Sequence, residues 1–124
     1  MPMSSERPAV LVVEDEVLIR MAVADTIAEA GFAVCEAGNA DQAIKLLESR
    51  ADIRALFTDI DMPGSMDGLK LAAAVRTRWP AIKIIITSGH VKIRAEELPV
   101  EGKFISKPYD AARIVSTLRY MVAA

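Results

Sequence analysis

Residues 55–64 read Ala-Leu-Phe-Thr-Asp-Ile-Asp-Met-Pro-Gly, and this stretch decides how the chain folds. Its apolar start gives way to polar residues and then to Pro63 and Gly64, which rule out a helix and force a turn. A buried parallel strand ends in this way at the edge of its sheet. Asp59 is therefore expected at a strand tip, the edge where open α/β sheets bind ligands, with Asp61 as a second carboxylate beside it.

The composition is that of one folded domain. The chain has 124 residues, of which 52% are hydrophobic and 26% are charged. These fractions are typical of a globular protein with a single core. Residues 1–8 are predicted to form an N-terminal tail and residues 9–122 a single domain, because no linker or internal repeat interrupts the pattern.

Charge, hydropathy and cysteine content argue against several classes of function. The formal net charge of −2 gives no electrostatic case for nucleic acid binding. No segment approaches the roughly 18 apolar residues that span a membrane, and no signal peptide is recognisable. The single Cys35 cannot form an internal disulfide. We therefore expect a cytoplasmic protein in which Cys35 is a core residue rather than a reactive thiol.

Hydrophobic periodicity predicts five strands that alternate with five helices, and hence an α/β fold whose parallel sheet is covered on both faces. Gly31 is a good terminator for the first helix, and Asp110 is a good cap for the last. Asn39 is predicted to cap the second helix, with Gln42 completing a partial capping box. The predicted strands are 9–13, 32–37, 55–59, 82–86 and 103–106, and the predicted helices are 17–30, 40–49, 68–79, 91–97 and 111–122.

Polar side chains follow four of the predicted strands where each strand ends. Because parallel strands end at the same edge of a sheet, these groups converge on one pocket if the strands are neighbours. The residues are Glu14 and Asp15 after the first strand, Asp59 at the third, Thr87 and Ser88 at the fourth, and Lys107 after the fifth.

These residue types suit phosphoryl transfer. Carboxylates in one pocket repel each other unless a cation joins them, and Mg²⁺ prefers oxygen ligands and commonly binds one or two carboxylates plus a phosphate. Lys107 adds a positive charge and Thr87 a hydroxyl donor. A carboxylate such as that of Asp59 is itself able to act as the nucleophile and form an aspartyl-phosphate.

Each part taken alone has an ordinary structural interpretation. An acidic pair such as Glu14-Asp15 favours a helix N-terminus, Thr87 is by itself a cap or core hydroxyl, and a Lys-Pro pair after a strand is usually structural. The functional interpretation depends on the joint arrangement at matching strand ends.

The ordered motifs resemble the receiver domain of two-component response regulators, the family of the chemotaxis regulator. The resemblance covers residues 8–122 and implies a flavodoxin-like, doubly wound sheet with the strand order 2-1-3-4-5. The motifs are Val10–Glu16 (Val-Leu-Val-Val-Glu-Asp-Glu), Asp59–Pro63 (Asp-Ile-Asp-Met-Pro), Met66-Asp67-Gly68, Ile86–Gly89 (Ile-Thr-Ser-Gly) and Phe104–Pro108 (Phe-Ile-Ser-Lys-Pro).

The resemblance also implies a role for each residue of the predicted site. It makes Asp59 the phosphoacceptor, Asp15 a direct Mg²⁺ ligand and Glu14 its acidic partner acting through water. Further implied roles are a backbone carbonyl ligand from Asp61, a switch hydroxyl on Thr87, a phosphate-binding amine on Lys107 and the aromatic switch at Phe104. Two residues, Gly64 and Ser65, separate Pro63 from Met66 where the family usually has one, so the loop beside Asp59 is one residue longer.

By resemblance, the chain is a phosphorelay module that catalyses only its own phosphorylation and dephosphorylation. The implied partners are a histidine kinase or histidine phosphotransfer protein, and a downstream effector or a second copy bound through residues 91–122. One alternative is a phosphatase or phosphotransferase of the haloacid dehalogenase type, because Asp59-Ile60-Asp61 matches its Asp-x-Asp fragment. That family carries the fragment on its first strand and needs a longer chain. The other alternative is a degenerate receiver that binds partners without phosphorylation.

Overall fold

The computed structural model describes residues 7–60, 67–88, 103–106 and 110–123. Within these residues the chain forms five strands and four helices, which alternate except that β5 follows β4. The strands are β1 (Ala9–Val13), β2 (Ala33–Ala37), β3 (Ile53–Asp59), β4 (Lys83–Ser88) and β5 (Lys103–Ser106), and the helices are α1 (Val17–Glu29), α2 (Ala40–Ser49), α3 (Gly68–Arg78) and α4 (Ala111–Ala123). The helix predicted over 91–97 lies outside the described residues.

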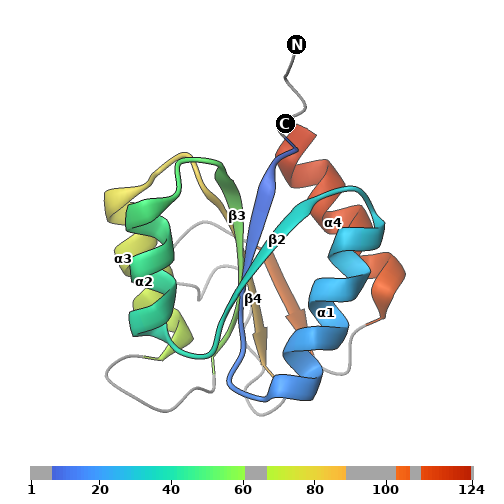
Figure 1. The fold of residues 1–124 in the computed structure, drawn as a ribbon, viewed down its shortest axis with the longest axis horizontal. Coiled ribbons are helices and arrows are strands. Elements are labelled where there is room, and N and C mark those ends of the chain that lie inside the picture. Colours follow the sequence, from blue (N-terminus) through green and yellow to red (C-terminus); the bar gives the residue numbers. More distant parts are fainter. Residues whose placement is uncertain (1–6, 61–66, 89–102, 107–109, 124) are drawn as a thin grey trace.

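The five strands form one sheet in the order β2-β1-β3-β4-β5, and every neighbouring pair is parallel. This confirms the predicted doubly wound architecture. Figure 1 shows α2 and α3 on one face of the sheet and α1 and α4 on the other. β1, β3 and β4 lie side by side in the middle of the sheet and run in the same direction, so the segments that follow them start from the same end of the sheet. We call this end the carboxyl edge and the opposite end the amino edge.

Each face of the sheet buries its own apolar cluster, because side chains alternate between the two faces of a strand. On the first face, Leu11, Leu56 and Ile84 pack against Leu47 of α2 and Leu71 of α3. The second face is packed against α1 and α4, and its members include Val12, Phe57, Ile85, Ile105, Val23, Ile27, Ile114 and Leu118. The central strands are buried on both sides, so they read as continuous apolar runs in the sequence.

The helix ends follow the predicted signals, with one change. Gly31 has a φ of 102°, the left-handed conformation that ends α1. The Asn39 side chain accepts a 2.9 Å hydrogen bond from the Gln42 backbone N–H. The Gln42 side chain accepts a 2.8 Å hydrogen bond from the backbone N–H of Gly38 rather than from that of Asn39, so the capping box reaches one residue further back than predicted. Asp110 accepts a 2.7 Å bond from the Arg113 backbone N–H, as expected of a cap.

Element boundaries differ from the predictions where pairing overrides local pattern. β3 starts at Ile53 rather than at 55, because Ile53 pairs with Ala9 of the central strand. The pairing then skips Arg54, which is exposed at this irregularity on the amino edge. β4 runs to Ser88, two residues beyond the predicted end, because Thr87 pairs with both β3 and β5.

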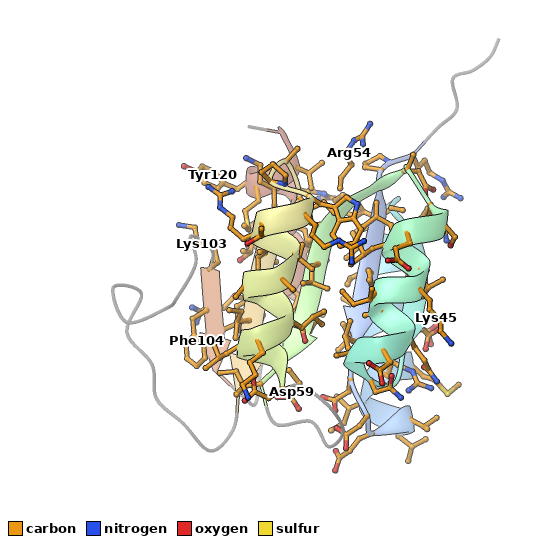
Figure 2. The ribbon with its side chains drawn as sticks, turned by 90° about the vertical axis from the view of Figure 1, so that its left-hand side faces the viewer. Lys45, Arg54, Asp59, Lys103, Phe104 and Tyr120 are labelled. Carbon is orange, nitrogen blue, oxygen red and sulfur yellow. The ribbon has the colours of Figure 1, made fainter. Side chains whose placement is uncertain are left out.

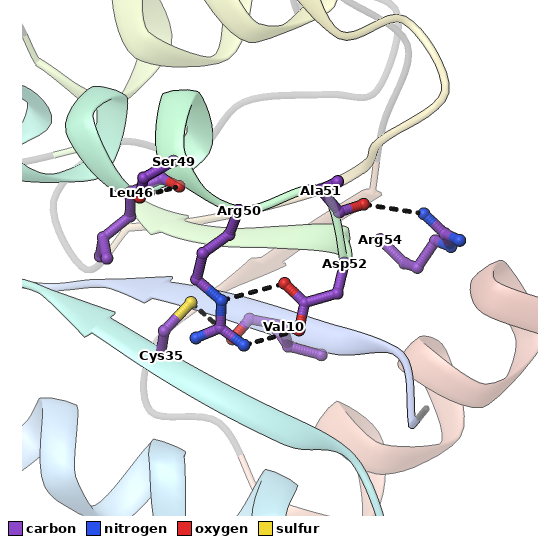
Figure 3. Close-up of polar contacts among 8 residues, drawn as sticks. All are labelled: Val10, Cys35, Leu46, Ser49, Arg50, Ala51, Asp52 and Arg54. Carbon is purple, nitrogen blue, oxygen red and sulfur yellow. Dashed lines mark hydrogen bonds and ion pairs between the residues drawn. The ribbon is translucent and has the colours of Figure 1, made fainter. Parts of the chain in front are cut away.

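The amino edge carries the polar contacts drawn in Figure 3. Arg50 makes two parallel hydrogen bonds to Asp52, of 2.9 and 2.6 Å, and these bonds hold the pKa of the Asp52 carboxyl below its ordinary value. Cys35 is only half-buried, because β2 is the outermost strand on one side of the sheet. Its Sγ lies 3.9 Å from the Val10 carbonyl oxygen. Burial raises the pKa of the Cys35 thiol, which disfavours the reactive thiolate.

Candidate functional site

Three carboxylates meet at the carboxyl edge of the sheet. Glu14, Asp15 and Asp59 each offer an oxygen, and these oxygens all lie within 4.8 Å of one another. Glu14 and Asp59 are each only 3% exposed, whereas Asp15 is exposed to solvent. The structure therefore brings together the acids that the sequence placed after the first and third strands.

Asp59 is the last residue of β3, and the adjacent strand fixes its position. Asp59 pairs in register with Thr87 of β4, and the Ile60 backbone N–H donates a 2.9 Å hydrogen bond to the Thr87 carbonyl. The Thr58 hydroxyl, also buried, donates a 3.1 Å bond to the Asp59 carbonyl. The hydrogen bonding between β3 and β4 thus extends one residue past β3, to Ile60. The Asp59 carboxylate is therefore attached to backbone that these hydrogen bonds hold in place.

The start of α3 approaches this backbone so closely that only glycine fits. A Cβ atom built on Gly68 would lie 1.9 Å from the Asp59 carbonyl oxygen, and the Gly68 N–H donates a 3.1 Å bond to the Ile60 carbonyl. Asp67 caps the same helix by accepting a 2.9 Å bond from the Lys70 N–H. The sequence showed Gly68 within a motif, but its steric role depends on a contact with β3 that no local pattern reveals.

Thr87 has a buried hydroxyl with no hydrogen-bond partner among the described residues. The side chain is fully buried and stands on the strand next to Asp59. An unsatisfied buried hydroxyl costs roughly 1–3 kcal/mol. The hydroxyl is therefore available to a group that is not part of the described protein.

Phe104, on β5, pairs with Ile86 and is half-buried against the cluster on the α2 and α3 face. Figure 2 shows Phe104 and Asp59 toward the same end of the molecule, and Arg54 at the opposite end. Two other predicted site residues, Asp61 and Lys107, lie outside the described residues. Lys107 directly follows Ser106, the last residue of β5, which pairs with Ser88 of β4.

The acidic cluster fits a hard divalent cation. Mg²⁺ takes oxygen ligands and usually binds one or two carboxylates while keeping several waters. Glu14, Asp15 and Asp59 supply such oxygens, and the exposure of Asp15 leaves one side of the cluster open to solvent. At the amino edge, Asp52 forms an ion pair with Arg50.

Comparisons with known proteins point to one family. The family model of the response regulator receiver domain matches residues 10–119. A putative NtrX-like response regulator of Rickettsia felis is 33% identical over 114 residues, which cover 89% of this chain and 24% of that protein. The chain thus spans about a quarter of the length of this curated relative.

Solved structures show the same fold. The receiver domain of NtrX from Brucella abortus is 33% identical, with a TM-score of 0.85 over 93% of this chain and 98% of that one. A response regulator receiver protein from Sinorhizobium medicae is 27% identical, with a TM-score of 0.89 over 98% of both chains.

Nothing in these comparisons supports the haloacid dehalogenase alternative. Its Asp-x-Asp fragment belongs on a first strand, whereas Asp59 ends β3. Among the residues that the structure describes, no helix combines the length and hydropathy needed to cross a membrane.

Proposed function

The chain belongs to the response regulator receiver domain family, and on this premise we propose that Asp59 is its phosphoacceptor, in a reaction supported by Mg²⁺. Members of this family are phosphoacceptor signalling modules of two-component systems. The observation that carries the proposal is the position of Asp59, buried at the end of a central strand and within 4.8 Å of two further carboxylate oxygens.

In the proposed reaction, a carboxylate oxygen of Asp59 attacks the phosphorus of a phosphohistidine or acyl phosphate. The new oxygen–phosphorus bond forms as the bond to the donor breaks, and the electron pair leaves with the donor. Glu14 and Asp15 would hold Mg²⁺, which neutralises charge on the phosphoryl oxygens when bound. Thr87 would donate its hydroxyl to a phosphoryl oxygen, Lys107 would supply a second positive charge, and the Asp61 carbonyl would complete the protein ligands.

The experiment is phosphorylation by acetyl phosphate with Mg²⁺, followed by intact-mass spectrometry. Wild type should gain one phosphate, and Asp59→Asn should gain none, because the amide is not a nucleophile of comparable strength. Asp52→Asn is the matched control, since it removes a carboxylate that is paired with Arg50 at the amino edge. An adduct that persists in Asp59→Asn would move the acceptor elsewhere, and no adduct in wild type would favour the degenerate receiver.

The phosphoryl donor is proposed to be a histidine kinase or histidine phosphotransfer protein. Its docking surface is supported by three exposed apolar residues at the start of α1, Val17, Leu18 and Met21, of which Leu18 is 82% exposed. This patch begins two residues after Asp15, with Glu16 between them, so it borders the acidic cluster. A protein that delivers a phosphoryl group to Asp59 must cover this border, and apolar residues there favour a protein partner over water.

Output is proposed to pass through residues 91–122 to an effector or a second copy. In this proposal Thr87 moves toward the phosphoryl group, and Phe104 turns further inward to fill the space left behind. Among the described residues of this face, Tyr120 is 71% exposed, and the Lys103 amine lies 5.8 Å from its ring centroid.

Beryllofluoride, a phosphoryl mimic, tests this output. In wild type it should shift NMR signals at the acidic cluster and at β5 and α4, whereas Thr87→Ala should confine the shifts to the cluster. Thr77→Ala is the matched control, because its exposed hydroxyl bonds only to the Ala73 carbonyl within α3. Wild-type shifts that stop at the cluster, or a full response in Thr87→Ala, would contradict the switch role.

A further inference from the structure

The two acids that directly follow β1 pose a geometric problem. Successive residues of a strand point to opposite faces of the sheet. Glu14 and Asp15 are successive, yet both bring a carboxylate oxygen within 4.8 Å of the other and of Asp59. The chain must therefore leave strand geometry at this point and hold a defined bend, since a change in that bend would turn one carboxylate away.

Three hydrogen bonds fix the bend around Glu14. Its backbone N–H continues the ladder to β2 with a 3.1 Å bond to the Ala37 carbonyl. Its carboxylate oxygen Oε2 accepts a 3.1 Å bond from the Glu16 N–H, two residues on. Its carbonyl, which has left the ladder, accepts a 3.0 Å bond from Nη1 of Arg20 on α1. Arg20 thus bonds the backbone of the acidic pair from the first turn of α1.

Arg20 is itself held in place from β2. Its Nε donates a 3.2 Å hydrogen bond to Oε1 of Glu36, and the Arg20 side chain is only 20% exposed. A Cβ atom built on Gly38 would lie 3.1 Å from Nη1 of Arg20, so the guanidinium also lies against the backbone that follows β2. The guanidinium therefore links the ends of two neighbouring strands to the first turns of α1.

We propose that Arg20 is a positioning residue for the metal site, which orients Glu14 and Asp15 through the Glu14 carbonyl and is itself oriented by Glu36. This inference rests on the proposed function, in which the acidic cluster binds Mg²⁺. Glu16, the residue at the N-cap of α1, makes no side-chain capping bond, so the junction between β1 and α1 depends on Arg20 rather than on an ordinary cap.

The charge of Arg20 and its proposed positioning role predict opposite effects on the affinity for Mg²⁺, which makes the proposal testable. A guanidinium that bonds the Glu14 carbonyl repels a divalent cation bound at the acidic cluster, so charge alone would let Mg²⁺ bind more tightly once Arg20 is replaced by a neutral residue. Positioning predicts the reverse, because residues that orient metal ligands typically cost about 10-fold or more in metal affinity when replaced. Arg20→Lys separates the two effects further, since it keeps the charge but loses the planar fork that reaches both Glu14 and Glu36.

The experiment is a Mg²⁺ titration followed by NMR at the amides of Glu14, Asp15 and Asp59. We expect the dissociation constant to rise about 10-fold in Arg20→Gln and to rise also in Arg20→Lys. Glu36→Gln should raise it by a smaller factor, because Arg20 keeps its bond to the Glu14 carbonyl. Arg78→Gln is the matched control, since Arg78 forms an exposed ion pair with Glu48 on the α2–α3 side and should leave Mg²⁺ binding unchanged.

A second measurement needs no metal. Amide hydrogen exchange at Glu16 should be faster in metal-free Arg20→Gln than in wild type or Arg78→Gln, because loss of the bend frees the N–H that bonds Glu14. Unchanged or tighter Mg²⁺ binding in both Arg20 variants would overturn the inference while leaving the proposed function intact. Absence of Mg²⁺ binding by wild type itself would overturn the metal-dependent function and the inference together. Should Arg20→Gln fail to fold, the outcome for Glu36→Gln decides, because that change lies at a partly exposed side chain.

Discussion

Acidic side chains are arranged differently at the two edges of the sheet. At the carboxyl edge, Glu14 and Asp59 are buried close to Asp15, so like charges gather where water is scarce. At the amino edge, Asp52 is partly exposed and forms two hydrogen bonds with Arg50. The ion pair at the amino edge lowers the energy of the apoprotein, whereas the carboxyl edge brings together three carboxylates of the kind that bind a hard divalent cation.

The difference supports the carboxyl edge as the proposed ligand site. Three carboxylates meet there, which is an arrangement that suits a divalent cation. The carboxyl edge also leaves the buried Thr87 hydroxyl without a partner among the described residues and requires Gly68 for a close backbone approach. The following predictions compare the effects of substitutions at the two edges.

The largest effect is expected from Gly68→Ala. The new methyl group would lie 1.9 Å from the Asp59 carbonyl oxygen, so α3 or the end of β3 must shift. We expect a loss of about 3 kcal/mol in the free energy of unfolding, the upper part of the usual range for overpacking, together with loss of phosphorylation. Denaturant unfolding and the acetyl phosphate reaction measure both.

Gly31→Ala is the matched control for this change. Gly31 has a φ of 102° and nothing within 4 Å of an added Cβ atom. It should cost about 1 kcal/mol through backbone strain alone and leave phosphorylation unchanged. Equal losses in the two variants would show that the close approach at Gly68 is not special to the carboxyl edge.

The next effect concerns Mg²⁺ and Asp15. At a Mg²⁺ concentration of 100 times its dissociation constant, wild type should gain about 2.7 kcal/mol in the free energy of unfolding. Asp15→Asn should raise the stability of the metal-free protein, because it relieves repulsion within the cluster, and should reduce the gain from Mg²⁺. Thermal unfolding with and without Mg²⁺ tests both the higher stability of the metal-free variant and its smaller gain from Mg²⁺. An Asp15→Asn protein that is stabilised by Mg²⁺ as strongly as wild type would remove Asp15 from the ligand set.

The smallest effect is expected at the amino edge. Because Arg50 lowers the pKa of Asp52 in the folded state, the pair stabilises the protein above roughly pH 4, and this contribution disappears as pH falls through the lowered pKa. Both side chains are partly exposed, at 34% for Arg50 and 42% for Asp52, so Asp52→Asn should cost less than about 1 kcal/mol at pH 7. The difference from wild type should vanish once the pH falls below the lowered pKa of Asp52, as measured by urea unfolding across pH. A difference that persists at that pH would point to a packing role instead.

The sequence by itself determined the order of the described elements and the places where the strands end, and it predicts which polar groups stand at those ends. Continuous apolar runs such as Ala9–Val13 mark strands buried on both faces, and a polar break after each run marks its end. Caps at Asn39 and Asp110 are local signals of a few residues, so they too were predictable. The strand order and the roles of Asp61 and Lys107 came from family resemblance rather than from the physics of this chain.

Only the tertiary structure decided how those groups meet. The bend that turns both Glu14 and Asp15 toward Asp59 depends on Arg20 and Glu36, which stand on different elements and form no local motif with the acids. The need for glycine at position 68 arises from a backbone that is nine residues earlier in the chain. Sequence patterns report which way a side chain faces along its own strand or helix, whereas distances of a few ångströms between elements are set by packing, and the chemistry of the site depends on those distances.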